Sequence, residues 1–279
     1  MAAASSEREA TGGVRILDGE SYVASVSEQT TGGEIWPAAR ALLAFLLGAG
    51  RSIVPARARC LELGSGTGWL GMVLAAGGAA PEVCEVVLSE YGGGLAWLRL
   101  NVGHNYESFK CPVGVVECDW DWFAPRPGDD APVARGSVAA QIVERGPWDL
   151  VFGSDLVYND AGVHGLPCCL AALARGGCPC ILYAHTLHRF DNCDVEFFLS
   201  LHRNGMVYRE LATSEAHCDD APSGTAAPRA ARPPSPPPFS ELFPEQRPAI
   251  FRIATMECAH LLGGPAEDRH SAALRAVGR

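Results

Sequence analysis

Apolar positions along the chain follow two different spacings, and their succession predicts the fold. From Ala39 onward, apolar residues recur at the three-and-four spacing of one helix face, and Gly48 and Gly50 end this helix. Beyond it, short apolar runs of strand type alternate with helical patterns. Short strands that alternate with helices predict a parallel sheet joined by right-handed crossovers.

The expected strands lie near residues 59–63, 85–89, 113–117, 148–152 and 179–184. Two further strands, near residues 207–211 and 249–255, would close the sheet at one edge. The intervening helices are marked by Leu70, Val73 and Leu74, by Leu95, Leu98 and Val102, and by residues 163–174. The sequence therefore predicts a single open α/β sheet.

Some segments fall outside this alternation. Residues 1–12 are small and polar, so we expect a disordered N-terminus, followed by a strand or hairpin within residues 14–27. Residues 124–146 and 213–248 are interpreted as insertions, and the second has a proline-rich core for which a surface loop is favoured over a docking motif. With an exposed tail at residues 259–279, we expect one domain over residues 13–258.

Composition and net charge limit the partners and the location that we expect for the protein. A formal net charge of -10 repels phosphate backbones, which disfavours a nucleic-acid partner and favours a basic peptide or protein. The eleven cysteines show no even disulfide spacing, and the N-terminus lacks the apolar core of a secretory signal. The longest apolar stretch, residues 35–50, is too short to cross a bilayer. We expect a soluble, monomeric, cytoplasmic protein with no membrane partner and with the nucleus as the alternative location.

The strongest local signal is the segment CLELGSGTGWLG at residues 60–71, where a strand runs through a glycine turn into a helix. Gly64, Gly66 and Gly68 let the backbone turn sharply and approach a ligand closely. The run from Gly66 to Gly71 also satisfies the G-x-G-x-x-G pattern of dinucleotide-binding proteins, so a nicotinamide oxidoreductase stays open.

Acidic residues at three strand ends distinguish between a nicotinamide dinucleotide and S-adenosylmethionine as the cofactor. A pyrophosphate is anionic and prefers a bare helix N-terminus, whereas the amino acid half of S-adenosylmethionine carries an ammonium. Glu62 offers that ammonium an acceptor, and Glu90 can accept the ribose hydroxyls of either cofactor. Asp119 and Trp120 suit the amine and the face of adenine, with a loop acid and a capping aromatic as the alternative. Together these residues favour S-adenosylmethionine.

In this order the motifs resemble those of class I (seven-β-strand) S-adenosylmethionine-dependent methyltransferases, and more narrowly of methyltransferase family 16, which is protein-lysine methyltransferase-like. The matching segments are EIWPAA at residues 34–39, LELGSGTG at 61–68, LSEY at 88–91, NVGHN at 101–105, DW at 119–120 and WDLVFGSDLVY at 148–158. The resemblance covers roughly residues 34–211 and resumes at 243–254. Two departures are Glu90, where the family more often has Asp, and the glycines from Gly92 to Gly94.

The resemblance implies a Rossmann-like, doubly wound, mostly parallel seven-stranded sheet with an antiparallel edge strand and helices on both faces. It also implies methylation of a lysine side chain of a protein substrate, with Asp155 and Tyr158 as the catalytic pair and Trp36 over the cofactor. Asp155 would accept a hydrogen bond from the incoming amine, and Tyr158 would wall the acceptor channel. Methyl transfer from a sulfonium is an in-line displacement, so alignment and exclusion of water are most of the catalysis. Without the resemblance, Asp155 could cap a turn and Tyr158 could pack on the sheet.

Several alternatives stay open at this point. Other protein side chains and small molecules are possible acceptors within the same class, and a non-catalytic binding module that kept the fold is a second class. His185 and His188 follow the fifth strand and are interpreted as ordinary polar neighbours. The cysteine pairs at 168–169 and 178–180 lack metal-ligand spacing, so we predict no metal.

Overall fold

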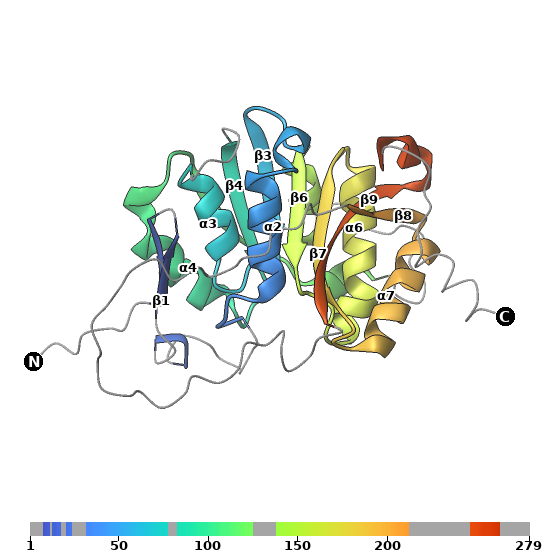
Figure 1. The fold of residues 1–279 in the computed structure, drawn as a ribbon, viewed down its shortest axis with the longest axis horizontal. Coiled ribbons are helices and arrows are strands. Elements are labelled where there is room, and N and C mark those ends of the chain that lie inside the picture. Colours follow the sequence, from blue (N-terminus) through green and yellow to red (C-terminus); the bar gives the residue numbers. More distant parts are fainter. Residues whose placement is uncertain are drawn as a thin grey trace, which may run out of the picture.

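An open seven-stranded sheet forms the centre of the molecule (Figure 1). The computed structural model describes residues 8–11, 13–17, 21–23, 32–77, 83–124, 138–211 and 246–262. The strands of the sheet are β3 (Ala58–Leu63), β4 (Val83–Glu90), β5 (Val113–Glu117), β6 (Leu150–Ser154), β7 (Ile181–Leu187), β8 (Met206–Leu211) and β9 (Arg247–Thr255). Their order in space is β5-β4-β3-β6-β7-β9-β8.

The strand order reverses beside β3, and this point sets where a ligand can bind. Strand β3 pairs in parallel with β4 on one side and with β6 on the other, so the chain moves outward first in one direction and then in the opposite one. The sheet is parallel from β5 to β7, while β9 pairs antiparallel with both β7 and β8. In such sheets ligands bind at the carboxyl ends of the strands next to the reversal.

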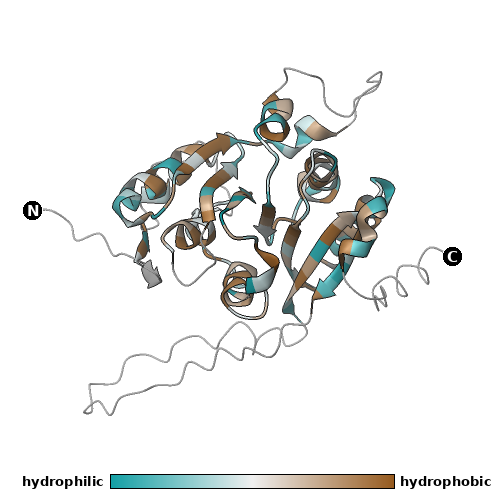
Figure 2. Cartoon of the chain, turned by 90° about the horizontal axis from the view of Figure 1, so that it is seen from above, coloured by the Kyte–Doolittle hydropathy of each residue, from teal (hydrophilic) through white to brown (hydrophobic). Residues whose placement is uncertain are grey.

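Helices cover both faces of the sheet, and each face has its own apolar core. One core contains side chains of α2 (Pro37–Leu47), α3 (Trp69–Ala75) and α4 (Leu95–His104), and the other those of α5 (Val138–Glu144), α6 (Leu166–Arg175) and α7 (Asp191–Arg203). Within β3, Leu61 and Leu63 enter the second core whereas Ala58 and Cys60 enter the first. Figure 2 shows the apolar residues gathered on the central strands. No helix in the described ranges is long and apolar enough to cross a membrane.

Short helical turns complete the connections. They are η1 (Arg51–Ile53), η2 (Tyr106–Ser108), η3 (Trp120–Phe123), η4 (Ala161–Gly165), which has π-helical hydrogen bonding, and η5 (Met256–Leu262). Because η3 directly follows β5 and η4 comes shortly after β6, both lie near the carboxyl edge of the sheet.

The predicted architecture is confirmed: the α/β class, the seven strands, the mostly parallel pairing and the helices on both faces are all observed. The strand bounds differ from expectation by at most three residues. The antiparallel strand is β9, which lies one position in from the edge, and β8 occupies the edge itself.

Three surrounding segments contain elements that the sequence did not predict. The insertion predicted at 124–146 contains α5, because Ala139 and Ile142 stand one turn apart and both enter the core. Residues 8–11, expected to be disordered, form β1 (Arg8–Thr11), which pairs with β2 (Val14–Ile16). The first residues of the expected tail belong to η5, where Leu262 is buried. Residues 1–7, 125–137, 212–245 and 263–279 lie outside the described residues, and so does the proline-rich core.

Two buried asparagines, Asn101 in α4 and Asn105 directly after it, hold β2 in place. The Asn105 side chain accepts a hydrogen bond from the Arg15 amide (2.7 Å) and donates one to the Arg15 carbonyl (2.8 Å). The Asn101 side chain accepts a bond from the Leu17 amide (3.0 Å). These contacts satisfy main-chain groups of β2 that would otherwise need water. The NVGHN segment therefore docks the N-terminal hairpin on the sheet domain.

Replacing Asn105 with Ala is expected to release this hairpin, because both main-chain groups of Arg15 lose their partner. The free energy of unfolding should fall by about 1–3 kcal/mol, the cost of leaving such groups unsatisfied. Amide hydrogen exchange at Arg15 and Leu17 should accelerate. The control is Arg99→Ala on the exposed face of the same helix, which should change neither quantity. Unchanged exchange in Asn105→Ala would contradict the assignment.

Candidate active site

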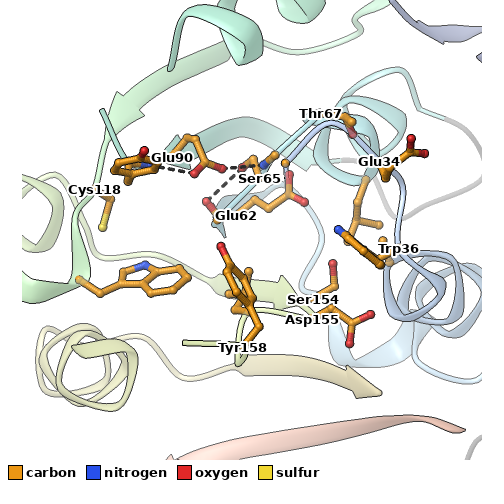
Figure 3. Close-up of a pocket in the computed structure, with 18 of the residues that line it drawn as sticks. Glu34, Trp36, Glu62, Ser65, Thr67, Glu90, Cys118, Ser154, Asp155 and Tyr158 are labelled. Atoms are coloured by element: carbon orange, nitrogen blue, oxygen red, sulfur yellow. Dashed lines mark hydrogen bonds between the residues drawn. The ribbon is translucent and has the colours of Figure 1, made fainter. Parts of the chain in front are cut away.

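A cavity of about 480 Å³ opens at the carboxyl ends of the central strands, beside the reversal of strand order (Figure 3). Nine of the residues singled out in the sequence line it: Trp36, Glu62, Gly64, Gly66, Glu90, Asp119, Trp120, Asp155 and Tyr158. Gly68 is not among the lining residues. It precedes α3 with a left-handed φ of 76°, and a Cβ atom there would lie 2.6 Å from a methyl group of Leu98, so glycine is needed for the entry into α3 and for its packing against α4.

The glycine turn after β3 needs its glycines for conformation and for space. Gly64 and Gly66 have φ values of 56° and 51°, in the left-handed region that side chains disfavour. A Cβ atom at Gly64 would lie 2.5 Å from a methyl group of Leu156, and one at Gly66 would lie 3.1 Å from the carbonyl oxygen of Gly32. The turn is therefore enclosed from both sides by other pocket segments.

Glu62 is the most deeply buried acid of the cavity. Its side chain accepts a hydrogen bond from the Gly71 amide (3.1 Å), in the first turn of α3. Burial raises the pKa of the Glu62 carboxyl to about 8, which the bonds from Gly71 and Ser65 offset only in part. A cation bound beside Glu62 would restore the ionised form.

Glu90 ends β4 and ties it to the glycine turn. One carboxylate oxygen accepts from the Gly66 amide (2.7 Å) and the other from the Tyr91 amide (3.1 Å). Burial raises the pKa of this carboxyl, against the lowering effect of both bonds. Its side chain runs close to Gly94, where a Cβ atom would lie 2.6 Å from the Glu90 Cγ. Gly94 has φ -93° and ψ -14°, a conformation open to any residue, so the neighbouring glutamate is what requires glycine there.

Asp119 and Trp120 open η3 directly after β5. The Asp119 side chain accepts a hydrogen bond from the Asp121 amide (3.0 Å), so it caps the turn while its residue lines the cavity. The indole N–H of Trp120 is buried and has no hydrogen-bond partner among the described residues. An unpaired buried donor in a cavity wall is costly unless a ligand or water accepts from it.

Asp155, at the end of β6, is held in an unusual conformation. Its φ is 50°, a left-handed value uncommon for a residue with a side chain. Both carboxylate oxygens accept bonds from Thr186 of β7, one from the amide (2.7 Å) and one from the hydroxyl (3.0 Å). The Asp155 amide in turn donates to the Ala184 carbonyl (2.9 Å). These bonds fix the carboxylate at the cavity wall.

Two aromatic residues stand near Asp155. Tyr158 is 40% exposed and lines the cavity, so it reaches both the pocket and the surface. Trp36 lines the cavity just before α2, and the guanidinium of Arg189 stacks on its ring with 4.1 Å between the guanidinium carbon and the ring centroid. Arg189 itself does not line the cavity. Trp36 is therefore held between the cavity and a cation of the loop that follows β7.

The cavity is strongly acidic. Six of its lining residues are acids, namely Glu34, Glu62, Glu90, Asp119, Asp121 and Asp155, and none is Lys, Arg or His among the described residues. In the described ranges no group of three or more His, Cys, Asp or Glu side chains could hold a metal ion. The walls thus favour a positively charged organic ligand over an anionic one.

The sequence patterns missed several contributors to this site. Thr186 binds both oxygens of Asp155, although its position at the end of β7 was a usable signal. Gly32, Ser65, Cys118 and Asn159 also line the cavity. His185, interpreted as an ordinary polar neighbour, is buried within β7 and lies in a hydrogen-bonded network instead.

Comparisons with known proteins identify a matching family and several similar solved structures. A family model described as lysine methyltransferase matches residues 22–204. Similar solved structures include a methyltransferase from Pyrococcus furiosus (13% identity, TM-score 0.43, 82% of this chain and 88% of that one). The methyltransferase domain of bacterial CtHen1 (12%, 0.45, 77% and 97%) and a precorrin-6y C5,15-methyltransferase from Geobacter metallireducens (14%, 0.38, 74% and 86%) are also similar. No curated protein sequence matches the chain.

The raised pKa of Glu62 predicts a specific pH dependence of stability. The carboxyl has a pKa of about 8 in the folded chain, against an ordinary value of 4.5 that stands for the unfolded chain. The stability that the protonated carboxyl contributes is therefore fully present below pH 4.5 and is lost as the pH rises through 8. Glu62→Gln keeps an acceptor for the Gly71 amide but cannot ionise. In urea unfolding at a series of pH values, this variant should lose less stability than the wild type between about pH 5 and about pH 8. Parallel profiles for the two proteins would contradict the burial argument.

Proposed function

We propose that the chain, which belongs to the lysine methyltransferase family, transfers a methyl group from S-adenosylmethionine to the side-chain amine of a protein lysine. Membership of the family makes the chain a methyltransferase and implies use of S-adenosylmethionine. The cofactor site, the acceptor site and the lysine specificity are the proposal.

One observation carries the choice of cofactor: six acids and no basic side chain line the cavity in the described part of the chain. S-adenosylmethionine carries an ammonium and a sulfonium, and both gain from surrounding carboxylates. A dinucleotide would place two phosphates against these acids with no Lys or Arg to pair them. The G-x-G-x-x-G pattern from Gly66 to Gly71 therefore does not support a nicotinamide oxidoreductase.

Different cavity residues would bind different parts of the cofactor. Glu62 would accept the ammonium, and Glu90 the ribose hydroxyls. Trp120 and Asp119, which both line the cavity, would contact adenine. The glycine turn permits the close approach that these contacts need. Bound S-adenosylmethionine supplies an electrophilic methyl group on its sulfonium.

Asp155 and Tyr158 are the residues we assign to the acceptor. Each carboxylate oxygen of Asp155 accepts one bond from Thr186, and because a carboxylate oxygen has two lone pairs, each can accept one more. The carboxylate can thus receive a hydrogen bond from a lysine amine and favour its alignment. Tyr158, which is exposed at the cavity wall, would flank the aliphatic part of that lysine and exclude water.

The acceptor can be identified directly. A lysate from cells that lack this protein is incubated with radiolabelled S-adenosylmethionine and the purified chain, and the labelled band is analysed by mass spectrometry. We expect a labelled protein in which the methyl group is on lysine. Label on arginine, histidine or a small molecule would retain the enzyme class and replace the acceptor. No binding of S-adenosylmethionine in calorimetry at millimolar cofactor would favour a non-catalytic binding module.

Asp155→Asn tests the acceptor assignment without disturbing the turn. Asn tolerates the left-handed conformation, and its amide can accept from the Thr186 amide and donate to the Thr186 hydroxyl. We expect the rate of methyl transfer at saturating cofactor to fall by about 100-fold or more, as for loss of a charged group beside the reacting amine. The dissociation constant for S-adenosylmethionine should change by less than about threefold, a difference below 1 kcal/mol.

The matched control is Asp160→Asn, which removes the same charge from an exposed position in the following turn, where the side chain makes no capping bond. This variant should keep the wild-type rate. Equal rates for Asp155→Asn and the wild type would refute the assignment of Asp155.

A further inference from the structure

Two residues with side chains adopt left-handed backbone conformations beside the acceptor wall, and such conformations persist only where the surroundings hold them. Asp155 directly follows β6, and His188, with φ 62°, follows β7 in the loop that carries Arg189. Asp155 carries the carboxylate proposed for the acceptor site, and His188 is next to the cation that stacks on Trp36. Hydrogen bonds from one buried network reach both places.

The inner branch of this network reaches the turn that contains Asp155. The Leu156 amide donates to the hydroxyl oxygen of Tyr183 (3.1 Å), and that oxygen lies 3.2 Å from Nδ1 of His185. On the other side of the ring, Nε2 of His185 lies 2.7 Å from one carboxylate oxygen of Asp194. All three residues are at most 5% exposed, and none of them lines the cavity.

The outer branch starts from the second oxygen of Asp194. This oxygen accepts a hydrogen bond from the His188 amide (3.0 Å), which fixes the loop after β7 at its left-handed residue. Arg189 is the next residue, and its guanidinium stacks on Trp36 and lies 5.3 Å from the ring centroid of Phe190. Asp194 thus connects, through its two oxygens, to both Asp155 and Trp36.

Counting protons gives the network a direction. The Tyr183 oxygen accepts from Leu156, so its single proton donates to Nδ1 of His185. The remaining ring proton is then on Nε2 and donates to Asp194. With a proton on Nδ1 as well, the Tyr183 hydroxyl proton would have no acceptor among the described contacts. His185 is therefore in the neutral Nε2–H tautomer, and Asp194 must accept on both oxygens.

Packing leaves these groups little freedom to rearrange. The His185 ring is stacked with Tyr183 at 5.6 Å between centroids, and it also contacts the rings of Phe197 and Phe198 at 6.5 and 6.4 Å. Both phenylalanines are fully buried on α7, the helix that carries Asp194. A change at Asp194 must therefore be transmitted along the hydrogen bonds rather than absorbed by rotation of the ring.

We propose that Asp194 is a positioning residue that sets both walls of the acceptor site, the turn with Asp155 and Tyr158 through His185 and Tyr183, and Trp36 through His188 and Arg189. The inference rests on the proposed function for the reaction that it serves. Asp194 touches no reacting atom, and its effect is exerted by acting as the double acceptor of the network.

Asp194→Asn tests this proposal because an amide has only one acceptor oxygen. If that oxygen faces the His188 amide, the amide nitrogen faces Nε2 of His185, and the ring must move its proton to Nδ1. If that oxygen instead faces Nε2 of His185, the amide nitrogen of the variant side chain faces the His188 amide, and these two hydrogen-bond donors repel each other. We expect long-range ¹H–¹⁵N correlation spectra to show Nε2–H in the wild type, and the variant to show either Nδ1–H or faster exchange of the His188 amide. The transfer rate at saturating S-adenosylmethionine, with lysate protein as acceptor, should fall by about 10-fold to 100-fold.

The control is Glu196→Gln on the same helix, where Glu196 pairs with Arg203 at the surface. It should keep the wild-type tautomer and rate. Tyr183→Phe and Arg189→Gln each break one branch, and we expect each to lose less rate than Asp194→Asn. They also keep the test decisive if Asp194→Asn does not fold.

The proposal is overturned if the wild type shows Nδ1–H, if Asp194→Asn keeps both the tautomer and the rate, or if both single-branch variants keep the wild-type rate. Failure of the proposed function has a different signature, since the wild type itself would then bind no S-adenosylmethionine or transfer no methyl group. The tautomer measurement needs neither cofactor nor acceptor.

Discussion

Main-chain amides that donate to buried carboxylates are the interaction on which the pocket depends. They join Gly71 to Glu62, Gly66 to Glu90, Thr186 to Asp155 and His188 to Asp194. Burial of an acid is unfavourable without a partner, and the usual partner is a basic side chain. Here peptide dipoles supply part of the compensation, so the first three of these acids persist in a cavity wall that contains no Lys, Arg or His among the described residues, and Asp194 persists behind it. The raised pKa of Glu62 is the sign that compensation is incomplete until a cation binds.

The sheet could be predicted from the sequence because its strands are short apolar runs bounded by turns, and because parallel strands are buried on both faces. The spacing of Ala139 and Ile142 was missed, since three buried positions in a seven-residue helix give a weak periodic signal beside a loop. The pairing of β1 with β2 was missed for another reason. The hairpin is held on the sheet domain by Asn101 and Asn105, which bind main-chain atoms more than 80 positions away in the sequence.

The position of the site followed from the sequence, since residues at the carboxyl ends of neighbouring parallel strands converge on one edge. Nine of the ten residues singled out line the cavity, and Gly68 faces α4 instead. The hydrogen bonds that hold these side chains in place could not be predicted from the sequence. Thr186 reaches Asp155 only because β7 lies beside β6 in one register and because Asp155 is left-handed. A sequence pattern fixes which residues reach an edge, but not which hydrogen bonds they exchange there.

The contact between Glu90 and Gly94 makes the start of α4 a sterically constrained position. The backbone at Gly94 suits any residue, and what excludes a side chain there is above all the Cγ atom of residue 90. Aspartate has a carbon at the same position, its carboxyl carbon, so exchange of glutamate for aspartate does not by itself make room for a larger residue at the helix start. Over evolutionary time, glycine at this position should therefore be retained with either acid at the end of β4.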